Sequence, residues 1–301
     1  MDGRLTFLGT GTSMGVPTLG CGCAVCTSAD PRDRRLRPSA LVRWREPRTE
    51  ISAYPPMQED KKQVLRLPSL AQDDSQKLAL AQDDSGRERV VLIDTGPDFR
   101  EQALRTGLTR VDAVLYTHGH ADHILGLDDL RPLSFNVFRE GGPIPLYASE
   151  TTTATLEKIF EYTFSPKATY SNRAKVKLMP LAARNPVHGV EFVRVPVMHG
   201  KMEIVGYRFG RTAYLTDVSA IPESSFALLE GLDELVLSAL RHIPHPNHAT
   251  VEQAVGWARR IGAKRTWLTH IAHELGHEAT NKTLPDGVAL AYDGLELAVT
   301  L

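Results

Sequence analysis

The chain has 301 residues, of which 42% are hydrophobic and 24% are charged, so it could form one large globular domain or two ordinary ones. The formal net charge of -1 gives no support for a polyelectrolyte partner and argues against binding of nucleic acid or of an acidic membrane surface. The opening MDGRLTFLGTG lacks the basic and apolar regions of a signal peptide, and no apolar run is long enough to cross a membrane. We therefore expect a cytoplasmic protein.

Short apolar runs or runs of alternating apolar and polar residues predict strands, and segments with apolar residues at helical spacing predict helices between the later strands. The predicted strands cover residues 4–9, 39–44, 89–95, 112–118, 144–149, 190–197, 203–209, 212–217, 234–240, 265–270 and 289–299. The predicted helices cover residues 97–107, 123–133, 149–164, 222–231 and 247–262. Strands that come first, followed by strands alternating with helices, favour a layered α/β sandwich over a barrel.

A polar stretch at about 45–89 interrupts this pattern, and it contains LAQDDS twice, at 70–75 and 80–85. The ten-residue spacing is too short for a solenoid repeat. We interpret the stretch as an insertion in a single domain that spans residues 1–301. A tolerated surface loop or hairpin extension is the main interpretation, and a flap that gates substrate is the alternative.

The three cysteines of the chain, Cys21, Cys23 and Cys26, lie within one short segment near its start. An odd number cannot pair completely in disulfides, and clustered cysteines in a reducing compartment more often bind metal. A metal site would need a fourth ligand from elsewhere in the chain. The alternative is three reduced thiols without a ligand.

The segment LYTHGHADHILGLDDL provides His118, His120, Asp122 and His123 directly after an apolar strand. Two imidazoles one residue apart at a strand end can point into one pocket, and the carboxylate and imidazole that follow can face a second position nearby. These four side chains are enough to anchor two metal ions.

Three further candidates, His199, Asp217 and His270, each follow an apolar strand. A single residue of this kind is usually a cap or a turn residue. Three with the same placement are expected to converge on one rim, because strand ends gather there in α/β folds.

This pattern resembles the metallo-β-lactamase superfold, whose signature is H-x-H-x-D-H followed by His, Asp and His. The resemblance implies a four-layer αβ/βα sandwich with two mixed β-sheets and outer helices. It also implies that one ion is held by His118, His120 and His199, that the other is held by Asp122, His123 and His270, and that Asp217 bridges them. The segment VVLIDTGPDF matches the strand and turn before the signature, so Asp94 is expected to orient metal-binding histidines.

Within the superfold, GCGCAVC after GTGTSMGVPTL resembles the phosphoribosyl 1,2-cyclic phosphate phosphodiesterases of the carbon–phosphorus lyase pathway. The resemblance implies a structural zinc held by Cys21, Cys23, Cys26 and the histidine three residues after the last active-site ligand, which is His273. Three thiolates and an imidazole fill a tetrahedral zinc shell. A histidine ahead of a helix contacts phosphate in that family, and His248 occupies this place, with His245 as a neighbouring candidate.

The resemblance therefore predicts a dinuclear metal-dependent phosphodiesterase that hydrolyses a small cyclic phosphate or phosphodiester through attack by a metal-bridged hydroxide, with Asp122, Asp217 and His248 at the reacting atoms. The active-site ligands suit Zn or Mn, with Fe a third option. Homodimers are common in that family, so a homodimer is one option here. The alternatives are a tRNA 3′-processing type of nuclease, a thioester or lactone hydrolase, and a non-catalytic protein of cofactor biosynthesis.

Overall fold

The structure is a computed structural model that describes residues 1–46, 86–167 and 172–301. Most of the polar stretch at about 45–89, including both LAQDDS segments, lies outside the described residues. The ends of this stretch belong to strands β2 (Ser39–Arg45) and β3 (Glu88–Ile93), which pair antiparallel with Arg45 opposite Glu88. The stretch therefore connects two neighbouring strands of one sheet.

The described residues form two seven-stranded sheets, and both mix parallel with antiparallel pairs. The first has the order β14-β1-β2-β3-β4-β5-β6, in which the strands not yet given are β14 (Glu296–Thr300), β1 (Asp2–Gly9), β4 (Ala113–Leu115), β5 (Ile144–Ala148) and β6 (Val176–Pro180). The second has the order β13 (Val288–Leu290), β12 (Arg265–Thr269), β11 (Glu234–Ser238), β10 (Thr212–Leu215), β9 (Met202–Phe209), β8 (Val190–His199) and β7 (Arg184–Val187).

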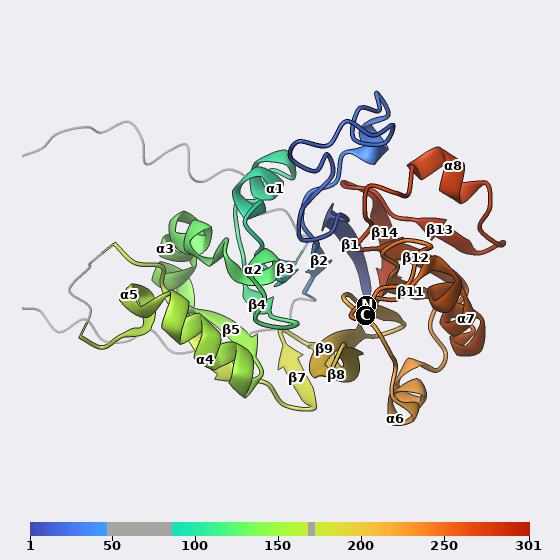
Figure 1. Cartoon of the computed structure of the whole chain (residues 1–301). Helices are drawn as coiled ribbons and strands as arrows, with labels where there is room; N and C mark the ends of the chain where they lie inside the picture. The colour runs from blue at the N-terminus through green and yellow to red at the C-terminus, as the bar shows by residue number, and fades with distance from the viewer. Residues whose placement is uncertain (47–85, 168–171) are drawn as a thin grey trace, which may run out of the picture.

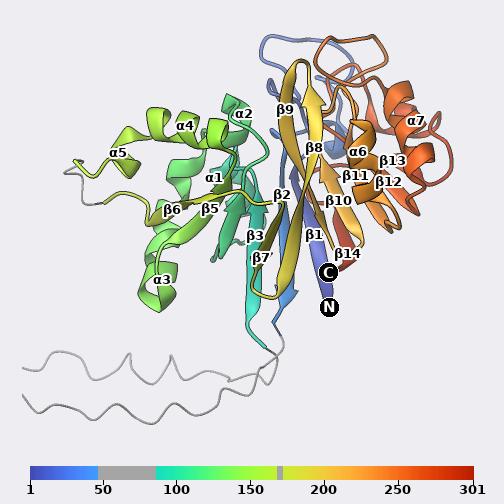
Figure 2. The same ribbon diagram turned by 90° about the horizontal axis from the view of Figure 1, so that it is seen from below.

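Helices flank the two sheets on their outer sides (Figures 1 and 2). The first sheet is accompanied by α1 (Phe99–Arg105), α2 (Ala121–Ile124), α3 (Arg131–Gly141), α4 (Glu150–Ile159) and α5 (Glu161–Phe164). The second is accompanied by α6 (Glu223–Phe226), α7 (Val251–Ile261) and α8 (His277–Asn281). No helix in the described ranges is long and apolar enough to span a bilayer.

Three clusters of buried apolar side chains lie between these layers. The central one joins the two sheets and includes Phe7, Trp44, Phe192 and Phe209. The second packs the first sheet against its helices and includes Leu92 and Phe99, and the third packs the second sheet against α7 and includes Leu237 and Val255. Each sheet is thus buried on both faces, and the predicted α/β sandwich is confirmed.

Several predicted elements differ from the structure at their ends. Helix α7 ends at Gly262, which has a positive φ, as the sequence predicts, but it begins at a capping box between Thr250 and Gln253 rather than at residue 247. The single helix expected over 123–133 is wrong, because α2 ends at Ile124 and a 3₁₀ turn at Leu127–Leu130 precedes α3. The strand expected over 289–299 is two strands with a turn between them. Edge strands β6 and β7 and helix α8 were not predicted.

Candidate metal centres

One rim of the sandwich carries all seven ligand candidates from the H-x-H-x-D-H pattern and its downstream partners, with Asp122 and His123 in α2 and the others at or just after strand ends. His118 and His120 lie between β4 and α2, His199 ends β8, Asp217 follows β10 and His270 follows β12. Their ligand atoms form two groups, each with all atoms within 4.8 Å of one another. One group is His118, His120 and His199, and the other is Asp122, His123, Asp217 and His270.

The backbone is strained at three residues of this rim. Asp94, Asp217 and His270 have φ values of 64°, 58° and 55°, a region that residues other than glycine rarely occupy. Among the described residues the one other non-glycine position of this kind is His188, in the turn between β7 and β8. Such strain costs on the order of 1–3 kcal/mol per residue and clusters at functional sites.

The first group consists of three imidazoles with contrasting burial. His118 and His199 are buried, whereas His120 is exposed. His118 Nε2 and His120 Nδ1 are 2.9 Å apart, and burial followed by the charge of His123 lowers the pKa of His118 well below its usual value. His199 Nδ1 lies 2.8 Å from the carbonyl oxygen of Asn247. A carbonyl only accepts, so Nδ1 of His199 carries the proton and its Nε2 is free to bind a metal.

The second group is almost fully buried and rich in carboxylate. His123 Nε2 lies 3.2 Å from Asp217 and 3.3 Å from Asp122, and His270 Nε2 lies 3.0 Å from Asp217. Burial opposes the charge on His270, but Asp217 and Asp122 outweigh it and raise the pKa of His270 to about 9. Burial would raise the pKa of Asp217, but His270 and His123 hold it well below its usual value. The buried carboxylates therefore require positive charge beside them.

Asp94 lies behind the metal-facing side chains and is fully buried. Its Oδ2 is 2.7 Å from His123 Nδ1, and its two oxygens accept hydrogen bonds from the backbone N–H and the hydroxyl of Thr117 at 2.8 Å. Burial raises the pKa of Asp94, although His123 opposes this. Asp94 thus fixes the orientation of His123, with Nε2 of that ring turned toward Asp122 and Asp217.

His248 lies on the same rim, ahead of α7. Its Nδ1 is 3.8 Å from Asp217 Oδ1, and its ring stacks on His270 with centroids 4.7 Å apart. Burial and the neighbouring His270 lower the pKa of His248 to about 3. His245 is adjacent, with its ring centroid 5.0 Å from that of His248. The ligand atoms of His199, Asp217 and His248 also lie within 4.8 Å of one another, so His248 is close enough to contact a bound metal as well as a substrate.

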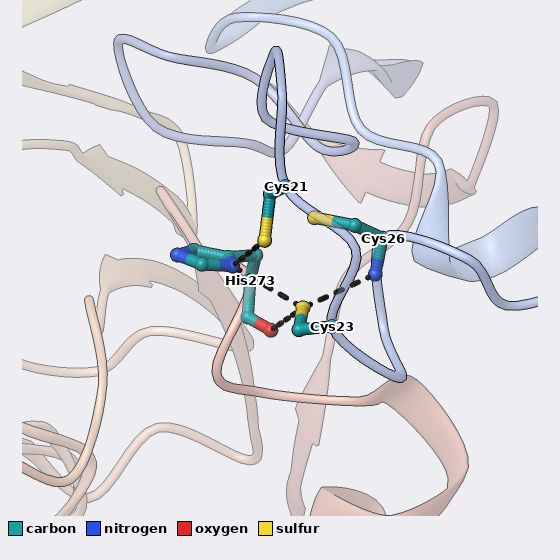
Figure 3. A group of neighbouring side chains, drawn as sticks. All are labelled: Cys21, Cys23, Cys26 and His273. Atoms are coloured by element: carbon teal, nitrogen blue, oxygen red, sulfur yellow. Dashed lines mark hydrogen bonds between the residues drawn. The ribbon is translucent and has the colours of Figure 1, made fainter.

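The second cluster gathers Cys21, Cys23, Cys26 and His273, as Figure 3 shows. Nδ1 of His273 is 3.3 Å from the sulfur atoms of both Cys21 and Cys23. The backbone N–H of Thr18 donates to Cys26 Sγ, and that of Cys26 donates to Cys23 Sγ. The backbone N–H of Cys26, followed by His273, lowers the pKa of Cys23 to about 6, whereas burial raises the pKa of Cys26 to about 11.

Both clusters have the donor chemistry of divalent metal sites. Three thiols and one imidazole match the tetrahedral set preferred by zinc. At the rim, the Nε2 atoms of His123 and His270 are buried without a hydrogen-bond partner in the described structure, although both face carboxylates. Buried nitrogen atoms without a hydrogen-bond partner, next to carboxylate oxygens, form a donor set that suits divalent cations.

One feature of the rim was not used in the sequence prediction. A threonine precedes three of the ligand candidates, at Thr117, Thr216 and Thr269, and all three are buried. Thr117 bonds Asp94, and the Thr216 hydroxyl donates to Asp217 Oδ2 at 2.6 Å. The recurring Thr before His or Asp at a strand end was a visible signal for these residues. Asn247, whose carbonyl orients His199, had no such signal because it acts through its backbone.

Comparisons with known proteins identify relatives of this chain. A model described as the beta-lactamase superfamily domain matches residues 89–271. A crystal structure described as a new diphosphatase from the PhnP family is 46% identical, with a TM-score of 0.80, over 99% of this chain and 98% of that chain. An octanoyltransferase of Porphyromonas gingivalis is 33% identical over 98% of this chain but 51% of its own length. The coenzyme PQQ synthesis protein B of Methylorubrum extorquens is 29% identical over 51% of this chain and 39% of its own length.

The layered fold and the imidazole and carboxylate rim define a protein with the metallo-β-lactamase fold and a candidate site for divalent metal ions. Within the beta-lactamase superfamily, the chain belongs to the PhnP family. It spans about half of the length of the curated octanoyltransferase, and less of the PQQ synthesis protein.

Proposed function

We propose that the chain is a phosphodiesterase that uses two divalent ions to hydrolyse a small cyclic phosphate or phosphodiester. The observation that carries this proposal is the pair of ligand groups on one rim, with Asp217 common to the second group and to the neighbourhood of His199 and His248. In this proposal His118, His120 and His199 hold one ion, and Asp122, His123 and His270 hold the other. Asp217 lies between them.

When bound there, divalent ions lower the pKa of a water molecule and neutralise developing charge on phosphoryl oxygens. The chain's own residues prepare the site for this chemistry. Asp94 keeps the proton of His123 on Nδ1, and the Asn247 carbonyl does the same for His199. Each ring therefore offers an unprotonated Nε2 to the rim, so little rearrangement is needed when a metal binds.

His248 is proposed to contact the substrate. Its Nδ1 is buried beside Asp217, which leaves Nε2 as the nitrogen that can face a ligand. A neutral imidazole with its proton on Nε2 can donate a hydrogen bond to a phosphoryl oxygen or to the leaving ester oxygen. His245, one ring contact farther out, is the neighbouring candidate for the same anion.

A diphosphate linkage is the second candidate substrate. The solved structure at 46% identity is described as a diphosphatase, and both diphosphates and phosphodiesters present a phosphorus atom with charged oxygens to the rim. A direct comparison of initial rates on a cyclic phosphate, a linear phosphodiester, a dinucleoside diphosphate, an octanoyl thioester and a tRNA precursor would rank these substrates. A thioester or tRNA preference would contradict the proposal.

The site assignment is tested by His120→Ala and Asp217→Ala, with bis(p-nitrophenyl) phosphate as substrate and metal content measured by mass spectrometry. Each variant is expected to lose on the order of 10³-fold or more in kcat/KM, because each removes a side chain on which both metal binding and charge stabilisation depend. His188→Asn is the matched control: His188 is exposed at the opposite end of β8, and asparagine tolerates its φ of 45°. Near-normal rate and metal content in either alanine variant would show that the assignment is wrong.

A further inference from the structure

A small cavity of about 120 Å³ lies beside the His118–His120 segment, on the side of the rim next to α4. It is lined by the two histidines, by hydroxyl side chains from Ser149 and the first turns of α4, and by Met202 and Glu203 at the start of β9. Cavities for drug-sized ligands are about 300–1,000 Å³. This one has room for a single small group that extends from the metal rim.

The hydroxyl groups in this cavity are arranged to bind other hydroxyl groups. Thr155 Oγ1 donates its proton to the Thr151 carbonyl at 3.0 Å, so it offers only lone pairs to a ligand. Ser149 Oγ donates to Thr152 Oγ1 at 2.9 Å and accepts from the backbone N–H of Thr152, so Thr151 Oγ1 is the donor in its 3.1 Å contact with Ser149 Oγ. The lining therefore offers mainly acceptors, to which the O–H of a ligand can donate.

The lining offers little to bind an anion apart from its two histidines. Among the described residues that line the cavity there is no lysine or arginine, and the Glu203 carboxylate is paired with Arg194 at 2.6 Å. The imidazoles of His199, His248 and His245 continue the rim away from the cavity, in ring contacts of 4.7 Å and 5.0 Å. A phosphate is thus favoured toward His248, and an uncharged group toward α4.

Gly119 brings the two sides of the cavity together. A Cβ at this position would lie 3.1 Å from Thr155 Oγ1 and 3.2 Å from Thr155 Cβ, tighter than ordinary contact. The glycine therefore lets the His118–His120 segment lie directly against α4. Any hydroxyl bound by Thr155 must be close to the rim histidines.

We propose that this cavity, bounded by Thr155, Ser149 and Glu203, binds a hydroxyl-bearing, uncharged part of the substrate and so determines which phosphodiesters are preferred. This inference rests on the proposed phosphodiesterase function. It assigns an orientation in which the phosphate lies toward His248 and the polyol portion, such as part of a sugar, lies toward α4.

The test compares Thr155→Val with the wild type on glycerol 1,2-cyclic phosphate and propane-1,2-diol cyclic phosphate, which differ by one hydroxyl group. The wild type is expected to prefer the glycerol compound in kcat/KM, and Thr155→Val to reduce that preference about threefold to tenfold, the effect of one net hydrogen bond. The ratio of the two substrates cancels any general loss of folded or metal-loaded enzyme. Thr153→Val is the matched control, because Thr153 lies on the same helix and lines a different depression.

Calorimetric binding of glycerol 1-phosphate and propyl phosphate gives a second readout that does not require turnover. Thr155→Val is expected to weaken binding of the first compound and leave the second unchanged. If the wild type hydrolyses both cyclic phosphates and neither the preference nor the binding ratio changes in Thr155→Val, the cavity assignment is overturned while the proposed function stands. If the wild type hydrolyses neither, the proposed function fails, and the binding ratio still decides whether the cavity recognises hydroxyl groups.

Discussion

The two clusters of ligand residues are built in different ways. Cys21, Cys23 and Cys26 come from one short loop whose own backbone N–H groups donate to two of the sulfur atoms, and only His273 comes from a distant part of the chain. The seven ligand candidates of the rim come from four separate strand ends, and two of them, Asp217 and His270, occupy strained backbone positions. The cysteine cluster is a local structure closed by one long-range contact. The rim exists only when both sheets are complete.

This difference predicts separate roles. A set of three thiolates and one imidazole leaves a tetrahedral ion no open position, so it joins loops and stabilises the fold. The rim combines buried His118 and His199 with exposed His120, so the ions it is proposed to hold would face the solvent side of the site. The clusters are also linked in sequence, because His273 follows His270 by three residues. Loss of a ligand residue from the cysteine cluster should therefore also disturb the position of His270 on the rim, because both histidines follow β12.

Cys23→Ser should have the largest effect on stability. Serine replaces a thiol whose sulfur lies 3.3 Å from His273 Nδ1 and whose pKa is lowered to about 6, so the cluster should lose about one equivalent of zinc. We expect the melting temperature to fall by about 10 °C or more, since structural zinc binding contributes directly to folding. Metal analysis and calorimetry on the same preparation measure both quantities. Ala24→Ser, at an exposed position of the same loop outside the ligand set, is the control, and unchanged zinc content in Cys23→Ser would mean that these residues are ordinary thiols.

Asp94→Asn should affect the rim and leave the cysteine cluster intact. The amide can keep one acceptor for the Thr117 N–H, but its NH₂ then faces His123 Nδ1, which must give up its proton. Protonation moves to Nε2, where it opposes metal binding, and rim metal affinity should fall about 10-fold to 100-fold. Titration with a chelator, monitored by metal analysis, separates rim metal from cysteine-bound zinc. Asp129→Asn serves as the control, and equal metal retention in the two variants would contradict the role of Asp94.

The sequence predicted which side chains gather on the rim, because the ligand candidates follow apolar strands. His118, His199, Asp217 and His270 each come at such a strand end, and parallel strands place their carboxyl ends at the same edge. What it could not predict was how those side chains turn toward one another. Asp94, Asp217 and His270 have positive φ values that no local preference of aspartate or histidine requires.

The missed elements share a physical cause. Strands β6 and β7 lie at sheet edges, and β7 contains Pro186, so neither has the continuous apolar pattern of a central strand. The helix predicted over 123–133 failed because Gly126 approaches the backbone of Gly96, with space for no Cβ, and this contact ends α2 early. In both cases tertiary packing decided the local structure.

The smallest predicted effect concerns the surroundings of the cysteine loop, where His277 packs on Tyr292 and its backbone N–H donates to Asp33. Burial, followed by the charges of Arg35 and Arg32, lowers the pKa of His277 to about 4, with Asp30 and Asp33 opposing. A folded-state pKa below the unfolded value of about 6.5 means that the unfolded chain binds more protons as the pH falls. The contribution of His277 to the free energy of unfolding is therefore fully present above about pH 6.5 and is lost as the pH falls from there to about 4.

His277→Gln should remove this pH dependence, so that the difference in unfolding free energy between variant and wild type shifts by about 1 kcal/mol from pH 7 to pH 5. Denaturant titrations at both pH values with excess zinc measure it, because protonation of the thiols affects both proteins alike. A difference independent of pH would show that His277 does not titrate in this range.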